Sequence, residues 1–136
     1  MNLGQTVIIR TDLFGDNVGL ISAQVAHIHM QALRHAVDRT LQSGHLEDLE
    51  GKENKMKDWL KQPYIFVKQV PNKEALEYFM GLAKEAGVEV NSWYDTAYVK
   101  LSPTQNKAFE NILIGASLGP DDADKIRTVV GDLPLL

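Results

Sequence analysis

The chain has 136 residues, of which 44% are hydrophobic and 24% charged, and its formal net charge at pH 7 is −4. This length and composition predict one soluble globular domain over residues 1–136 and leave too few residues for two ordinary domains. No apolar run approaches the roughly 20 residues of a membrane-spanning helix, and the absence of cysteine excludes disulfides and thiolate chemistry. The net negative charge argues against tight binding of nucleic acid, because proteins that bind nucleic acid are usually basic.

The first predicted unit is a buried strand that leads through a polar loop into a long helix. Residues 6–11 include an apolar run without alternation, which is typical of a buried parallel strand. Residues 12–17 carry turn-forming side chains, and Asp16 or Asn17 would cap the next helix by accepting a backbone N–H. That helix continues to about residue 42, where Ser43 and Gly44 predict its end. A strand, loop and helix in this order place ligands at the carboxyl end of a parallel sheet.

The middle of the chain predicts two strands and two helices. Residues 45–62 are rich in charge and indicate a short, largely exposed helix that ends before Pro63. Residues 64–70 form a strand of aromatic and β-branched residues, and residues 72–86 an amphipathic helix with Asn72 as its N-cap and Gly87 as its stop. Residues 88–94 are the third strand, and Asp95 is expected just past its carboxyl end.

The last third of the chain predicts a final strand and helix. Residues 98–101 are a short extended piece, and residues 110–117 supply the last main strand. Pro120 is expected at the start of a helix that ends near Val130, with Asp121 and Asp122 favourable to its macrodipole. The last two strands are too close in sequence for a helical crossover, so they should be antiparallel. We therefore predict an α/β fold of three layers, α/β/α, around a mixed four-stranded sheet.

Two sequence motifs point to a known family. Residues 10–13 read Arg-Thr-Asp-Leu and residues 19–27 read Gly-Leu-Ile-Ser-Ala-Gln-Val-Ala-His. They resemble the Arg-x-Asp-Leu and Gly-Lys-x-Ala-Ala-Gln-x-x-His runs of the type 2 peptidyl-tRNA hydrolase family, with Leu20 in place of the lysine. The family's Asp-Ala-Gly-Arg-Thr-Gln motif corresponds to Asp-Thr-Ala-Tyr-Val-Lys at residues 95–100, where only the aspartate is kept. The resemblance continues to the ending at residues 131–136 and implies the family's fold.

The resemblance also implies a reaction, the hydrolysis of the ester that joins a peptide to the 3′ ribose of tRNA. This chemistry needs a positioned water, a base, and cationic or N–H groups for the developing oxyanion. Of the family's functional positions, His27 and Asp95 remain as candidate catalytic residues. Leu20 and Val99 lack the lysine charge and the threonine hydroxyl, and Lys100 would return a charge from a different backbone position. The candidate substrate-binding residues are Asp12, Asn17, Gln24, Tyr98 and Lys100.

Each candidate also has a structural interpretation. His27 has the side chain of a general base, but a histidine at a helix–loop junction also serves simply as a hydrogen-bonding residue, which we favour without the lysine. Asp95 suits either a functional carboxylate or a turn. Gln24 would order the loop or contact a ligand. The aromatic side chains near Asp95 would stack on a base or pack at the sheet edge; they are Trp93, Tyr94 and Tyr98.

The histidines predict no metal site, and we expect no cofactor. His27 and His29 diverge on a helix, His35 lies too far along the axis, and no carboxylate follows at i+4. We expect no secretory signal, because the first residues lack a basic segment followed by an apolar one, and hence a cytoplasmic location. A homodimer is predicted from the family and from apolar residues that a small domain leaves uncovered, namely Trp59, Leu133, Leu135 and Leu136.

Three functions agree with these observations. The favoured one is a peptidyl-tRNA hydrolase-like protein that has lost or altered catalysis and binds a small ligand or a partner at the old site. The second is an active hydrolase that cleaves peptidyl-tRNA with His27 and Asp95 assisting water. The third is a hydrolase of another, less anionic acyl ester or amide. The substitutions at positions 20 and 99 and the net acidity favour the first.

Overall fold

The computed structural model describes residues 2–42, 59–61, 63–102 and 105–136, and within these the side chains of residues 39–42, 96–102 and 105–110 are left out. Seven elements follow in chain order: β1 (Leu3–Arg10), α1 (Val18–Gln42), β2 (Ile65–Val70), α3 (Lys73–Glu85), β3 (Val90–Ser102), β4 (Gln105–Asp122) and α4 (Ala123–Val130). The predicted helix over residues 45–62 lies outside the described residues apart from one helical turn at 59–61. The predicted stop at Ser43 and Gly44 also lies outside them.

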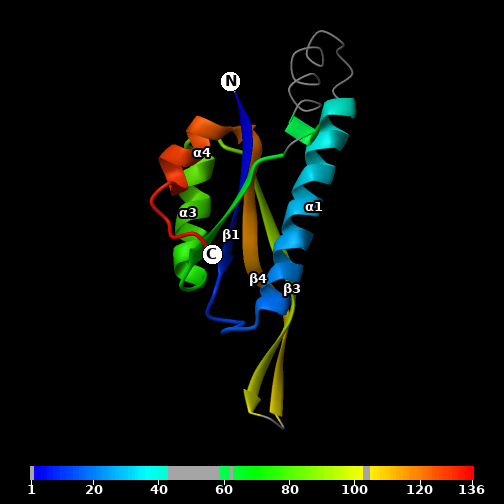
Figure 1. The fold of residues 1–136 in the computed structure, drawn as a ribbon, viewed down its shortest axis with the longest axis vertical. Helices are drawn as coiled ribbons and strands as arrows, with labels where there is room; N and C mark the ends of the chain where they lie inside the picture. Colours follow the sequence, from blue (N-terminus) through cyan, green and yellow to red (C-terminus); the bar gives the residue numbers. More distant parts are fainter. Residues whose placement is uncertain (1, 43–58, 62, 103–104) are drawn as a thin grey trace.

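The four strands form one mixed sheet in the order β2-β1-β4-β3. β1 runs parallel to β2 and antiparallel to β4, and β3 pairs with β4 antiparallel. Helix α1 covers one face of the sheet, and α3 and α4 cover the other (Figure 1). The predicted three-layer α/β/α architecture and the antiparallel pairing of the last two strands are therefore confirmed.

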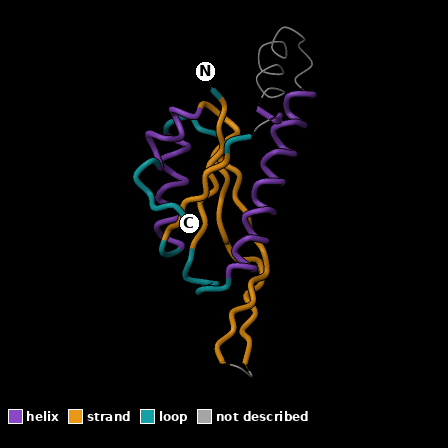
Figure 2. The backbone as a smooth tube through the Cα atoms, viewed as in Figure 1, coloured by secondary structure: helices purple, strands orange, loops and turns teal. Residues whose placement is uncertain are grey.

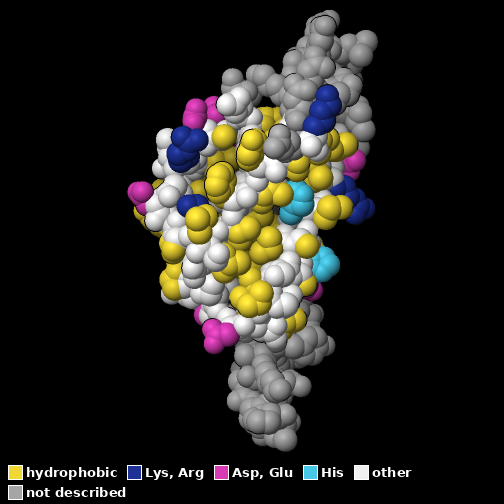
Figure 3. Space-filling model, viewed as in Figure 1, with side chains coloured by type: hydrophobic (Ala, Val, Ile, Leu, Met, Phe, Trp, Pro, Cys, Tyr) yellow, Lys and Arg dark blue, Asp and Glu magenta, His cyan; other side chains and the backbone are white. Residues whose placement is uncertain are grey.

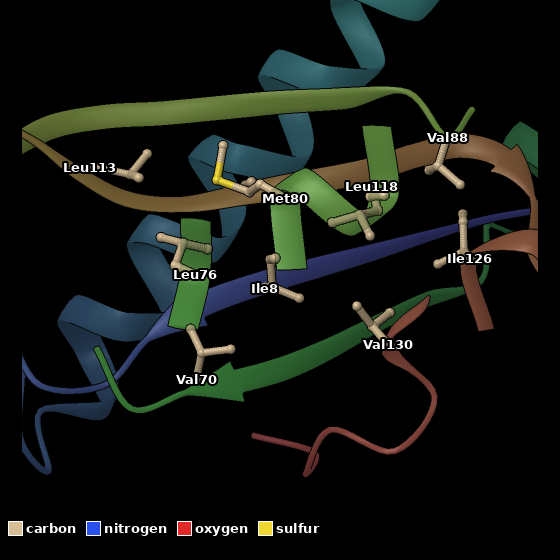
Figure 4. Close-up of a cluster of buried hydrophobic side chains, with 11 residues drawn as sticks. Ile8, Val70, Leu76, Met80, Val88, Leu113, Leu118, Ile126 and Val130 are labelled. Atoms are coloured by element: carbon tan, nitrogen blue, oxygen red, sulfur yellow. The ribbon is translucent and has the colours of Figure 1, made fainter. Parts of the chain in front are cut away.

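Within the described residues, an apolar cluster packs on each face of the sheet. Alternation along β1 sends Ile8 into the cluster beneath α3 and α4, and Ile9 into the cluster beneath α1. Figure 4 shows the first cluster, in which side chains of α3 and α4 point toward those of the strands. On the α1 side, a Cβ at Gly115 would lie 2.6 Å from the Ile8 carbonyl oxygen and 2.9 Å from Ile28 Cδ1. Only glycine therefore allows α1 to approach the sheet here.

The helix ends follow the predicted capping chemistry. Of the two candidates for α1, Asn17 is the cap, since its Oδ1 accepts from the Leu20 N–H at 3.1 Å. Asn72 caps α3 by accepting from the Ala75 N–H at 2.9 Å. At the other end of α3, Gly87 adopts φ +76°, and its N–H donates to Lys84 O at 3.0 Å.

The β3–β4 hairpin corrects several predicted boundaries. β3 does not end at residue 94: Asp95 lies within the strand, opposite Ile112, and residues 98–101 continue the same strand. β4 likewise exceeds residues 110–117 at both ends, and Pro120 lies in β4, whereas α4 begins at Ala123 with Asp122 as its N-cap. The hairpin extends beyond the helices (Figure 2). Strands that no helix covers need no alternating apolar pattern, so their length was not visible in the sequence.

Candidate functional site

A hydrogen-bonded chain joins α1 to β3 at the family motif. The Trp93 indole Nε1–H donates to Gln24 Oε1 at 2.8 Å, and Gln24 Nε2 donates to Asp95 Oδ2 at 3.2 Å. Because an indole N–H only donates, the Gln24 carbonyl must face Trp93, which turns the amide N–H groups toward the carboxylate. Gln24 is 7% exposed, so this buried amide fixes two β3 side chains at once.

His27 joins the same group through its ring. It follows Gln24 by nearly one helical turn, and its imidazole stacks on the Trp93 indole with ring centroids 5.5 Å apart and an interplanar angle of 13°. The imidazole is exposed, whereas Trp93 and Asp95 are half-buried. The structure therefore brings three of the sequence-predicted residues together, Gln24, His27 and Asp95, with Trp93 as their common neighbour.

The β3–β4 ladder is irregular at two points, directly after Trp93 and directly after Asp95. The register shifts between Trp93 and Tyr94 and again between Asp95 and Ala97, and both shifts place the extra residue on β4. Alternation along β3 is thus intact, which keeps Trp93 and Asp95 on the α1 face and sends Tyr94 to the other face. Tyr94 is 53% exposed and does not join the group.

The loop residues Asp12 and Asn17 have structural partners instead of joining this group. Arg10 holds Asp12 through two bonds, Nε to Oδ1 at 2.8 Å and Nη2 to Oδ2 at 2.7 Å, and it also donates to Leu113 O at 3.1 Å. The hydrogen bonds from Arg10 lower the pKa of the Asp12 carboxyl. Asn17 caps α1. Both residues therefore stabilise the loop between β1 and α1, the helix that carries Gln24 and His27.

Position 20, where the resemblance expects lysine, belongs to the packing. Leu20 is half-buried and lies against the α1-face cluster that contains Ile9, Phe14 and Ile21. The predicted substrate-binding residues Tyr98 and Lys100 are in β3, opposite Ala108 and Asn106, but their side chains lie outside the described residues.

This arrangement supplies part of what ester hydrolysis needs. The exposed His27 imidazole and the ordered Asp95 carboxylate are groups that accept a proton from water. Oxyanion stabilisation is less well provided: the Gln24 amide already donates to Asp95, and Arg10 is bound to Asp12. Among side chains that the structure describes here, none supplies the missing charge of position 20.

A second polar chain, absent from the sequence-based prediction, crosses the core between α1 and the sheet. His29 Nδ1 lies 2.6 Å from Gln5 Oε1, Gln5 Nε2 donates to Ser117 Oγ at 2.9 Å, and that hydroxyl donates to Gly119 O at 2.9 Å. Since Gln5 Oε1 only accepts, His29 Nδ1 is the donor. Burial lowers the pKa of His29. Gln5 and Ser117 gave no sequence signal, because buried polar residues in strands look like surface residues.

The described residues hold no group of three or more histidine, aspartate or glutamate side chains arranged for a metal ion. The described helices include none that is long and apolar enough to cross a membrane. The family model described as peptidyl-tRNA hydrolase PTH2 matches residues 3–136. The chain matches none of the curated proteins with which it was compared.

Proposed function

The chain belongs to the type 2 peptidyl-tRNA hydrolase family, and from this premise we propose a peptidyl-tRNA hydrolase-like protein with lost or altered catalysis, which binds a ligand or partner at the site around His27 and Asp95. Peptidyl-tRNA is the ligand that the family suggests, and a small ligand is the alternative. A cytoplasmic location belongs to the same proposal.

The observation that carries the proposal is the environment of Leu20. A lysine in its place would offer a charge to a phosphate or a developing oxyanion. Leu20 instead packs against the α1-face cluster, so an electrostatic contact of the family's site has become a hydrophobic one. The ordered carboxylate of Asp95 and the exposed ring of His27 remain available for binding.

A second candidate function is an active hydrolase, and the Gln24–Asp95 hydrogen bond favours it. That bond orients a carboxylate next to the His27–Trp93 stack, an arrangement in which a water could be held and deprotonated. A hydrolase of a less anionic ester or amide would use the same groups without a cation at position 20.

The deciding experiment is a turnover assay on peptidyl-tRNA with the wild type, Asp95→Asn and Asp132→Asn. Asp132 is an exposed carboxylate beyond α4, so its variant is the matched control. We expect no turnover above the rate without protein in any of the three. Turnover that is abolished by Asp95→Asn and kept by Asp132→Asn would instead establish the active hydrolase.

A binding measurement complements the turnover assay. An analogue with an amide in place of the ester cannot be released by hydrolysis, so its affinity reports binding alone. We expect the analogue to bind the wild type and to bind the Trp93→Ala variant more weakly, because that variant loses the His27 stack and a hydrogen bond to Gln24. Equal affinity of both proteins would contradict a site at this place.

The substitutions at positions 20 and 99 can be tested by reverting them. We expect Leu20→Lys with Val99→Thr to raise peptidyl-tRNA cleavage roughly tenfold or more above the rate without protein, since a charge-assisted contact made in the transition state is worth about 1.5–3 kcal/mol. A long lysine at a half-buried position can extend its charge to water, so the domain should stay folded. A folded double variant without any gain would mean that the site has been rebuilt for another ligand.

A further inference from the structure

A cavity of about 680 Å³ lies away from the site described above. Its walls are the start of β1, the start of β2 and helix α4, whereas the candidate site follows the end of β1. Tyr64 and Phe66 line the cavity and are 61% and 55% exposed. On the face shown in Figure 3, hydrophobic side chains gather between α1 and the α3–α4 layer, with lysine and arginine at the margins. Its volume is that of a small-molecule site.

Trp59 forms part of one wall of the cavity. It is 6% exposed, and its Nε1 is buried without a hydrogen-bond partner among the described residues. A buried indole N–H usually finds an acceptor, because leaving it unpaired costs about 1–3 kcal/mol. The Nε1 atom has no accessible surface, so a ligand in the cavity contacts the ring of Trp59 and not its N–H.

The charges around the cavity select an anion. Lys68 and Arg127 line it, and no aspartate or glutamate does so among the described residues. Lys68 Nζ donates to Gly131 O at 3.3 Å and to Leu133 O at 3.0 Å, which leaves one of its three N–H groups. Arg127 pairs with Asp124 at 3.3 Å, but both side chains are largely exposed, so this pair is weak and yields readily to a ligand.

We propose that this cavity binds a planar aromatic anion, a flat ring that carries a phosphate or another acidic group. The ring lies against Tyr64 and Phe66, and the anion meets Lys68 and Arg127. The cavity shares no residue with the His27–Asp95 site, so the proposal does not rest on the proposed function.

The test uses Trp59 as its own reporter. The chain has two tryptophans, so Trp93→Phe leaves Trp59 as the sole source of indole fluorescence. We expect saturable quenching by adenosine monophosphate, with adenosine and inorganic phosphate each binding at least about tenfold more weakly. Calorimetric titration of the unmodified chain repeats the measurement without any substitution.

The charge is tested with a matched pair of variants. Arg127→Gln should weaken the binding of adenosine monophosphate by about fivefold, the loss of one exposed charge-assisted contact. Arg34→Gln, which removes an exposed arginine of α1 outside the cavity, should leave it unchanged. Equal effects of the two variants, or equal binding of adenosine and its monophosphate, would overturn the anion site.

Two further outcomes would overturn the proposal as a whole. One is that neither adenosine monophosphate nor 1-anilinonaphthalene-8-sulfonate, a second aromatic anion, changes the Trp59 signal at millimolar concentration. The other is a dimer in sedimentation that Phe66→Glu dissociates and that these ligands do not affect, because the face would then be an interface between two copies.

Discussion

Replacement of Gln24 by methionine tests whether one buried amide holds the candidate site together. Methionine has nearly the same size and helix propensity, so the change removes the hydrogen bonds and little else. The neutral bond from Trp93 contributes about 1 kcal/mol, and the bond to the Asp95 carboxylate, longer and half-exposed, about 1–2 kcal/mol. The expected loss in the free energy of unfolding is therefore roughly 2–3 kcal/mol.

The matched control is Gln31→Met on the same helix. Gln31 Oε1 is buried and has no hydrogen-bond partner in the described part of the chain, so its replacement should be neutral or slightly stabilising. Urea unfolding of both variants measures the difference, and Trp93 fluorescence reports whether the indole has lost its acceptor. If Gln24→Met costs no more than Gln31→Met, the chain from Trp93 to Asp95 does not organise the site.

Three further predictions concern the core, pH and assembly. Gly115→Ala should cost about 2–3 kcal/mol in thermal or urea unfolding, because its Cβ would meet the Ile8 carbonyl; Gly81→Ala in α3, with nothing within 4 Å, should gain about 0.5–1 kcal/mol. Burial lowers the folded-state pKa of His29 below its ordinary value of 6.5, so the unfolded chain binds the proton first and stability should fall as pH falls from about 7 toward 5. His29→Gln should reduce this loss, whereas His35→Gln should not; equal urea midpoints across pH for the wild type would refute the argument. A homodimer predicts twice the monomer mass in light scattering at micromolar concentration, and a monomer mass throughout would contradict it.

The structure changes the grounds for expecting a dimer. Trp59, one of the apolar residues that suggested it, is buried within the monomer. Leu133 packs against the core beneath α3 and α4, and only Leu135 and Leu136 are exposed, at 61% and 50%. Their backbone lies along the edge of β2, where the Leu136 N–H donates to Val67 O at 2.9 Å. The homodimer therefore stays a prediction, and fewer exposed apolar residues support it.

The sequence predicted the fold well where burial or capping imposes a pattern. β1 contains the continuous apolar run Val7-Ile8-Ile9 because both faces of the sheet are covered there. Helix α3 begins after Asn72 and ends before Gly87 because these residues satisfy its terminal backbone groups. The hairpin was missed because its outer part buries no face. The predicted place of Pro120 at a helix start was wrong. Pro120 lies where the β1–β4 ladder is irregular, so its missing N–H costs the ladder no hydrogen bond, and a sequence does not show where a ladder is irregular.

The candidate site was predicted in part for similar reasons. Helical spacing alone puts Gln24 and His27 on one side of α1, and both contact the same residue of β3. The sequence alone could not identify this residue as Trp93. Its identity depends on which strand lies beside α1 and on the register of the β3–β4 pairing, which one added residue would shift. Asp95 was expected beyond the strand because aspartate is rare inside strands, yet the Gln24 amide provides a partner for it there.

The central place of β1 in the sheet has a consequence for how the chain folds during synthesis. β1 leaves the ribosome well before its partner strands: Gln5 pairs opposite Ile65, and Leu3 opposite Asp122. Helix α1 can form from local contacts alone, whereas the sheet waits until β4 has emerged. Until then the edge of β1 that pairs with β4 stays open, and an open edge beside apolar side chains favours chaperone binding and aggregation. Expression of chains cut before β4 should therefore yield insoluble protein.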